Sequence, residues 1–125
     1  MDVVALESHF GVKLAAGTCV SAGVLVQVNS SGQGVIAQDS STTRKPHGFS
    51  LTSGCGTKTT GLSQYVRLNR TGRVVDIGRT LTKGGKVYCI DGGLYDTSAP
   101  GTADYIVGFA LDDDEVYVDL DVADL

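Results

Sequence analysis

Four consecutive acidic residues near the end of the chain are the side chains with the clearest capacity for chemistry. The run covers residues 112–115, and clustered carboxylate oxygens are the ligands that calcium and magnesium prefer. The sequence lacks the spacing of a calcium-binding loop, with its glycine and its distal glutamate. Asp119, Asp121 and Asp124 form a second acidic set that could join the run in space. We interpret the run as a solvated hairpin turn and predict no metal site.

The histidines form no recognisable catalytic pattern. The sequence holds two, His9 and His47, and neither is paired with a serine or cysteine at a familiar spacing. The Gly-x-Ser-x-Gly turn of many hydrolases is also missing. We therefore predict that the chain is not an enzyme and has no catalytic residues and no cofactor. A small β-barrel hydrolase or metal-dependent enzyme is the weaker alternative, because catalytic groups are brought together in space rather than in sequence.

The three cysteines are widely spaced and include no Cys-x-x-Cys pair, which argues against a zinc site. We interpret them as reduced, although a single disulfide is left open. Cys19 and Cys89 lie in strand-like segments, where we expect small buried side chains. Cys55 lies between two glycines, so we expect it in an exposed loop.

The charges are unevenly distributed along the chain. The net charge is −4, yet residues 1–90 hold all ten basic residues and residues 91–125 hold ten of the 14 acidic ones. The acidic pI of about 4.9 argues against direct nucleic-acid binding. We predict instead a contact between copies of the chain, or a neutralisation of the two parts within one compact fold. The predicted contact residues are Arg67, Arg70, Arg73, Arg79, Asp112, Asp113, Asp114 and Glu115.

A repeated phrase gives the main evidence for the fold. Residues 23–29 and 48–51 have counterparts in residues 85–91 and 108–111, each pair ending in a Gly-Phe strand. With 125 residues, 17 glycines and two prolines, the chain is typical of one domain of short strands and turns. We predict an all-β fold, a single-domain small β-barrel or sandwich built from repeated hairpins.

The expected hairpins follow from alternating segments that flank turn residues. They join residues 24–28 to 35–37, 65–69 to 73–77 and 87–90 to 94–95, and strands at 105–111 and 115–120 close the fold. We expect residues 52–61 to form a long flexible loop. The sequence has neither a run of 18 apolar residues nor the features of a secretory signal, so we predict no membrane contact.

Several of these segments resemble a family of viral proteins. The residues that carry the resemblance are the run 14–20, the hairpin beginning Val-Gln-Val-Asn, the Gly-Phe-Ser-Leu strand, the segment Val-Arg-Leu-Asn-Arg-Thr-Gly-Arg-Val-Val, the segment Thr-Lys-Gly-Gly-Lys-Val-Tyr and the closing Tyr-Ile-Val-Gly-Phe-Ala-Leu. Over residues 14–122 this pattern is similar to the small head decoration proteins of tailed viruses, which have a β-tulip fold.

The resemblance implies a structural protein on the outer surface of the virion, assembled in the host cytoplasm. Such proteins form homotrimers that bind the major capsid protein at three-fold and quasi-three-fold positions and stabilise the icosahedral shell. An N-terminal arm, residues 1–13 here, would dock on the capsid protein ahead of a barrel domain at 14–125. The residues assigned to that contact are Val3, Val4, Leu6, His9 and Phe10. A small β-barrel module that binds a receptor or a glycan is the alternative.

Overall fold

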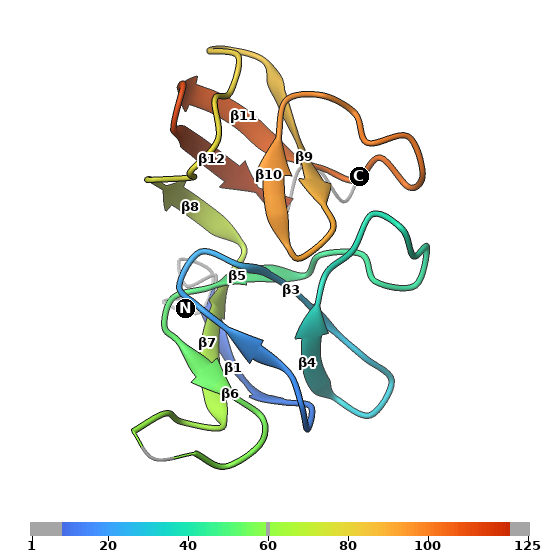
Figure 1. Ribbon diagram of the computed structural model, residues 1–125, viewed down its shortest axis with the longest axis vertical. Coiled ribbons are helices and arrows are strands. Elements are labelled where there is room, and N and C mark those ends of the chain that lie inside the picture. Colours follow the sequence, from blue (N-terminus) through green and yellow to red (C-terminus); the bar gives the residue numbers. More distant parts are fainter. Residues whose placement is uncertain (1–8, 60, 121–125) are drawn as a thin grey trace, which may run out of the picture.

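Two β-sheet units stacked on one another form the molecule (Figure 1). The structure is a computed structural model and describes residues 9–59 and 61–120. A closed barrel has the order β1-β4-β3-β5-β7, with strands β1 (His9–Leu14), β3 (Leu25–Val28), β4 (Gln33–Ile36), β5 (Gly48–Ser50) and β7 (Tyr65–Asn69). An open sheet has the order β10-β9-β11-β12-β8, with strands β8 (Thr71–Val74), β9 (Lys86–Ile90), β10 (Leu94–Asp96), β11 (Ile106–Asp112) and β12 (Glu115–Asp119). A two-stranded ribbon joins β2 (Cys19–Val20) to β6 (Gly54–Cys55). The predicted all-β class with a small barrel is confirmed.

The two units share one pairing scheme. In each, the first strand pairs with the last, the second and third form a hairpin, and the fourth lies between the second and the last. The register differs by one residue, since Phe49 faces Leu25 in the barrel, whereas Phe109 faces Lys86, the residue before the counterpart of Leu25 in the repeat. The repeat seen in the sequence is therefore a duplication of a five-stranded unit.

Closure distinguishes the barrel from the open sheet. Strands β1 and β4 pair in parallel through Lys13 opposite Gln33 and Leu14 opposite Gly34, whereas the equivalent β8 and β10 are the two edges of the open sheet in the described residues. At Gly34 an added Cβ would lie 3.0 Å from a Leu14 methyl group and 3.1 Å from Val26. Glycine at this position lets the barrel close around its apolar interior.

Two apolar clusters fill the molecule, one inside the barrel and one between the barrel and the open sheet. Strand β3 alternates, so that Val26 packs inside the barrel while Leu25 packs against the open sheet together with Phe49. The Leu25 N–H donates to the Gly93 carbonyl at 2.8 Å, and the Tyr95 hydroxyl donates to the Gly23 carbonyl. Because the units share side chains and hydrogen bonds, they form a single domain.

The segment around Arg70 passes straight from one unit to the other. Arg70 alone separates β7 from β8, and these strands belong to different sheets. The predicted hairpin of residues 65–69 with 73–77 is therefore wrong. Gly72 looked like a turn residue, but its Cα faces the Phe49 ring so closely that an added Cβ would lie 3.0 Å from the ring. This glycine permits close packing of the strand on the barrel.

The first described residues belong to the barrel. Strand β1 pairs with β7 from His9 opposite Asn69 to Lys13 opposite Tyr65. The predicted arm of residues 1–13 is thus wrong for residues 9–13, because alternation in this segment buries Val12 in the barrel. At the other end, the Leu120 N–H donates to the Arg70 carbonyl at 3.0 Å. The described chain therefore begins and ends beside the same junction.

The cysteines differ from the sequence-based expectation. Cys19 and Cys55, which are 36 positions apart in the sequence, form a disulfide, and they face one another in the β2–β6 ribbon. The interpretation that all three are reduced is wrong, and the exposures are reversed, since Cys19 is exposed and Cys55 is buried. Cys89 is buried as expected and is a free thiol. The ribbon and its disulfide also replace part of the flexible loop predicted at residues 52–61.

Candidate functional site

The predicted contact residues are spread over both units. Arg67 projects from the barrel strand β7, Arg70 stands at the junction, and Arg73 lies on β8. Arg79 lies in the segment between β8 and β9, and the acidic run forms the turn between β11 and β12. Of the residues assigned to an arm, His9 and Phe10 lie in β1, while Val3, Val4 and Leu6 lie outside the described residues.

Arg73 and Glu115 form an ion pair within one chain. The Arg73 Nε and the Glu115 Oε1 are 3.1 Å apart, and the two side chains are 65% and 21% exposed. The register of β8 on β12 brings them together, because Tyr117 faces Arg73 on the neighbouring strand. This pair accords with the alternative that basic and acidic segments neutralise each other inside one fold.

A second intramolecular pair links Arg79 to Asp96. The Arg79 Nη2 donates to the Asp96 Oδ2 at 2.6 Å. Partial burial alone would raise the pKa of Asp96, but the N–H of Ser98 and the Arg79 guanidinium outweigh it and hold this pKa below its ordinary value. Arg79 thereby fastens the segment after β8 to the outer strand β10.

Arg70 is turned into the junction between the units. Its Nη1 donates to the His47 carbonyl at 3.2 Å, and its Nη2 donates to the Leu120 carbonyl at 3.4 Å. The guanidinium thus connects the segment that precedes β5 with the segment that follows β12. This arrangement gives Arg70 a structural role at the centre of the molecule.

The acidic turn is organised by its backbone. The Leu81 N–H donates to the Asp113 carbonyl at 2.7 Å, and the Ile77 N–H donates to the Asp114 carbonyl at 3.2 Å. With Asp76 and Arg79, the turn lines an open hollow of about 410 Å³. Within residues 9–59 and 61–120, no group of three or more His, Cys, Asp or Glu side chains is placed to hold a metal ion.

The buried titratable groups lie in the core rather than in a cleft. Burial raises the pKa of the Cys89 thiol to about 12, and the nearby charges of Asp39 and Asp91 raise it further. The Asp39 Oδ1 accepts the N–H groups of Ala103 at 3.0 Å and Asp104 at 2.8 Å. Asp39 therefore anchors the loop before β11, and the Cys89 thiol stays protonated at neutral pH and is a poor nucleophile.

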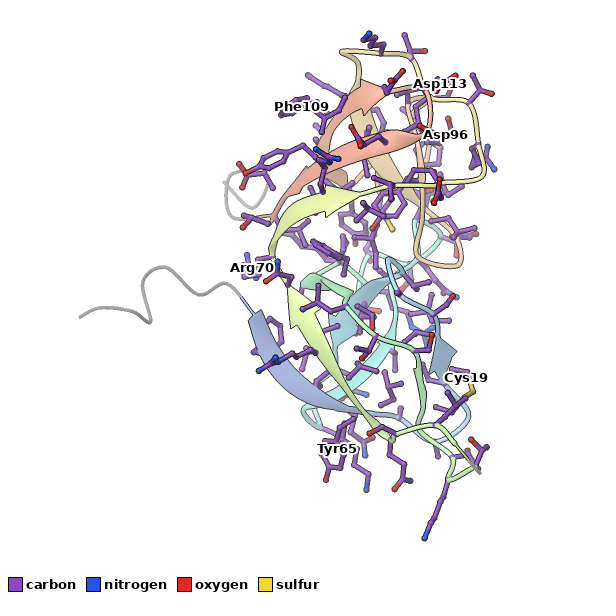
Figure 2. The ribbon with its side chains drawn as sticks, turned by 90° about the vertical axis from the view of Figure 1, so that its left-hand side faces the viewer. Cys19, Tyr65, Arg70, Asp96, Phe109 and Asp113 are labelled. Atoms are coloured by element: carbon purple, nitrogen blue, oxygen red, sulfur yellow. A yellow bond between two sulfur atoms is a disulfide. The ribbon has the colours of Figure 1, made fainter. Side chains whose placement is uncertain are left out.

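The outer surface of the open sheet is a feature that the sequence reasoning missed. One cross-strand row runs through Lys86, Phe109, Tyr117 and Arg73 on four adjacent strands. The Phe109 and Tyr117 rings are 5.5 Å apart, and Figure 2 shows Phe109 projecting away from the body of the molecule. The sequence repeat could have drawn attention to this surface, because it marks Phe109 as the counterpart of Phe49.

A β-bulge adds a further apolar residue to this surface. The register between β11 and β9 shifts between Ile106 and Gly108, so that Val107 is buried while Ile106 and Phe109 are 40% and 45% exposed. We call the surface formed by Lys86, Ile106, Phe109 and Tyr117 the Phe109 face.

Comparisons with known proteins give no relative. No protein-family model matches the chain, and no curated protein matches it. Among the described residues there is also no helix with the length and apolar character needed to span a membrane.

Proposed function

We propose that this chain is a structural protein of a virion that decorates an icosahedral capsid and stabilises it by binding the major capsid protein. The observation that carries the proposal is the duplicated fold, in which two equivalent five-stranded units share one core. Such a molecule offers broad sheet surfaces, which suit a protein that holds neighbours together. The resemblance of residues 14–122 to head decoration proteins supports the same proposal.

The proposed protein acts as a homotrimer on the outer surface of the shell, at three-fold and quasi-three-fold positions. Its work is done by contacts alone, because buried contact area with a capsid subunit raises the free energy needed to separate that subunit from its neighbours. Neither catalysis nor a cofactor is part of this role. Nucleic acid and membrane are not proposed as partners.

Binding to expanded capsids tests the proposal directly. Purified chain is mixed with expanded heads assembled from the major capsid protein of the virus that encodes it, and the mixture is sedimented. We expect the chain to sediment with the heads and to raise the temperature at which they lose their contents. Heads that neither retain the chain nor gain heat resistance would refute the proposal.

A binding module for a glycan or receptor is the second candidate. An open hollow of about 390 Å³ is lined by Gln27, Asn29, Ser30, Val35, Thr43 and Arg44. Amide, hydroxyl and guanidinium groups in such a hollow are suited to hydrogen bonding with sugar hydroxyls. A glycan array probed with the labelled chain distinguishes this function, which predicts saturable binding that is lost in Asn29→Ala.

A further inference from the structure

The disulfide lies at the end of the barrel that is farther from the open sheet. Figure 2 shows Cys19 at the edge of the barrel, at the end of the molecule away from Phe109. The two sulfur atoms differ in access, because Cys19 is exposed whereas Cys55 is only 6% exposed. Exposed disulfides are the ones that thiols in solution reduce and reform most readily. Cys19 is therefore the sulfur that a thiol from solution reaches first.

The ribbon that carries the two cysteines has hydrogen bonds of its own. The Gly56 N–H donates to the Thr18 carbonyl at 2.7 Å, and the Cys55 N–H donates to the Ser63 carbonyl at 3.0 Å. Neither Cys19 nor Cys55 belongs to the two apolar clusters of the core. We therefore expect the backbone to keep the two thiols opposite one another after reduction, so that the bond can form again in the folded chain.

The same ribbon braces the seam that closes the barrel. Strands β1 and β4 pair in parallel over two residue pairs, and the Ala15 N–H continues this short ladder by donating to the Gly34 carbonyl at 2.9 Å. Gly56 packs directly on Ala15, since an added Cβ at Gly56 would lie 1.9 Å from the Ala15 carbonyl oxygen. Cys19 follows Ala15 by four residues and Cys55 directly precedes Gly56. The disulfide thus holds together the two sides of this contact.

We propose that the Cys19–Cys55 disulfide is a reversible thiol–disulfide exchange site, entered at Cys19, whose oxidation state controls how firmly the β1–β4 seam is closed. The reactant is a small thiol of the glutathione class. The reduced chain stays folded but opens the seam more often, because a short parallel ladder then lacks the constraint of the bond. The inference goes beyond the proposed function, since it holds whatever the chain binds.

The exchange conserves atoms and electrons in two steps. A thiolate attacks the Cys19 sulfur and forms a mixed disulfide there, while the bond to Cys55 breaks and its electron pair leaves on the Cys55 sulfur, which takes a proton from water. A second thiolate attacks the small thiol's sulfur in the mixed disulfide, so that Cys19 leaves as a thiol and the two small thiols become one disulfide. The reverse sequence, with that small disulfide as the oxidant, restores the bond. Cys89 takes no part because it is buried.

Amide hydrogen exchange of the natural chain, first oxidised and then reduced with dithiothreitol, measures the seam directly. The reporter is the Ala15 N–H, and the reference is the Leu25 N–H, which bonds the Gly93 carbonyl between the units. We expect reduction to raise the ratio of the Ala15 exchange rate to the Leu25 exchange rate at least about tenfold, while the circular dichroism spectrum stays unchanged. Equal acceleration of both amides would show that the bond stabilises only the whole fold. That result, or a reduced chain that unfolds, would overturn the proposal.

Two variants assign the response to this bond. The double variant Cys19→Ser with Cys55→Ser should show the rate ratio of the reduced chain, and dithiothreitol should leave that ratio unchanged. The control variant Cys89→Ala lacks the third thiol and should keep the full response of the natural chain. Replacing dithiothreitol by oxidised glutathione should return the natural chain to its first ratio. A ratio that does not return would refute the reversibility that the proposal requires.

A matched pair of single variants tests the point of entry. Oxidised glutathione added to folded Cys55→Ser should form a stable mixed disulfide at Cys19, because the sulfur that displaces the glutathione is gone. In Cys19→Ser the remaining partner thiol is buried, so we expect its adduct to form at least about tenfold more slowly. Mass spectrometry of the intact chain and of its peptides measures both rates. Equal rates, or a faster reaction at Cys55, would overturn the assignment of Cys19 as the entry point.

Discussion

Phe49 and Phe109 hold equivalent positions in the two units, but Phe49 is 4% exposed and Phe109 is 45% exposed. Both follow a glycine in the fourth strand of their unit, and both face the start of the second strand. The difference arises because the open sheet packs on the barrel and covers Phe49. The same Gly-Phe sequence in the fourth strand of each unit has thus given one buried and one exposed aromatic residue.

Truncating these two residues should therefore have unequal effects on stability. Phe49→Ala leaves a cavity in the core shared by the two units, so we expect the free energy of unfolding to fall by about 3–5 kcal/mol. Phe109→Ala removes an exposed ring from the isolated chain, and we expect a loss below about 1 kcal/mol. Urea unfolding of both variants at a concentration where the chain is monomeric measures the difference. Equal losses would show that the units do not share a core.

Two adjacent glycines offer a matched test of the contact between the units. At Gly93 the backbone φ is +71°, and an added Cβ would lie 2.5 Å from the Leu25 carbonyl oxygen. At Gly92 the φ is +87°, but the nearest side-chain atoms lie 3.9 Å away. Gly92→Ala should cost about 1 kcal/mol for its backbone conformation, whereas Gly93→Ala adds a steric clash and should cost at least about 2 kcal/mol. Thermal unfolding ranks the two variants, and a Gly92→Ala effect as large as that of Gly93→Ala would contradict the packing described here.

The disulfide should stabilise the barrel side of the molecule. Replacing Cys19 and Cys55 by serine releases a constraint on the unfolded chain, and we expect the free energy of unfolding to fall by about 2–4 kcal/mol. Dithiothreitol should lower the melting temperature of the natural chain and leave the double variant unchanged. Thiol titration of the unfolded, unreduced chain should detect one free thiol, that of Cys89. Three free thiols would show that the bond is absent.

The buried thiol predicts a loss of stability in alkaline solution. Burial raises the pKa of Cys89 from its ordinary 9.0 to about 12, so the unfolded chain loses this proton at lower pH than the folded chain does. The contribution of the thiol to stability is complete below pH 9 and is lost as the pH rises towards about 12. The slope approaches about 1.4 kcal/mol per pH unit between these limits.

The variant Cys89→Ala isolates this effect, because it should remove the decline between pH 9 and 10 and make the decline above pH 10 less steep, whatever its overall stability. Burial also raises the pKa of Tyr95, so a further decline above the ordinary tyrosine value of 10.0 should persist in the variant. Urea unfolding at a series of pH values gives both profiles. Parallel profiles for the natural chain and the variant would contradict the assignment.

Local patterns predicted most of the strands, and the failures have identifiable physical causes. The turn glycines around Asp91 correctly indicated the β9–β10 hairpin, and the alternation of Val116 and Val118 correctly indicated the buried side of β12. The segment around Arg70 has the same local pattern as a hairpin, and only the existence of a second sheet shows that it runs straight. Alternation and turn residues describe a strand and its ends, but they do not say which sheet receives it.

The candidate contact surface was less predictable than the fold. The acidic turn was found from composition, whereas the pairing of Arg73 with Glu115 depends on the register of two strands far apart in the sequence. Phe109 was recognised as part of a repeat, but its exposure depends on how the units pack. The disulfide was not predicted because Cys19 and Cys55 are brought together by the pairing of β2 with β6, two segments that are distant in the sequence.

The positions of His9 and Leu120 beside the same junction have a consequence for engineering. His9 lies opposite Asn69, and the Leu120 N–H bonds the neighbouring Arg70 carbonyl, so a short linker could join these two points without disturbing either sheet. New chain ends opened in the exposed loop near Lys58 would then give a circular permutant with the same strand pairings. Cargo attached at either original point would leave the molecule from one place on its surface, which makes the chain a suitable carrier for paired display of two fused peptides.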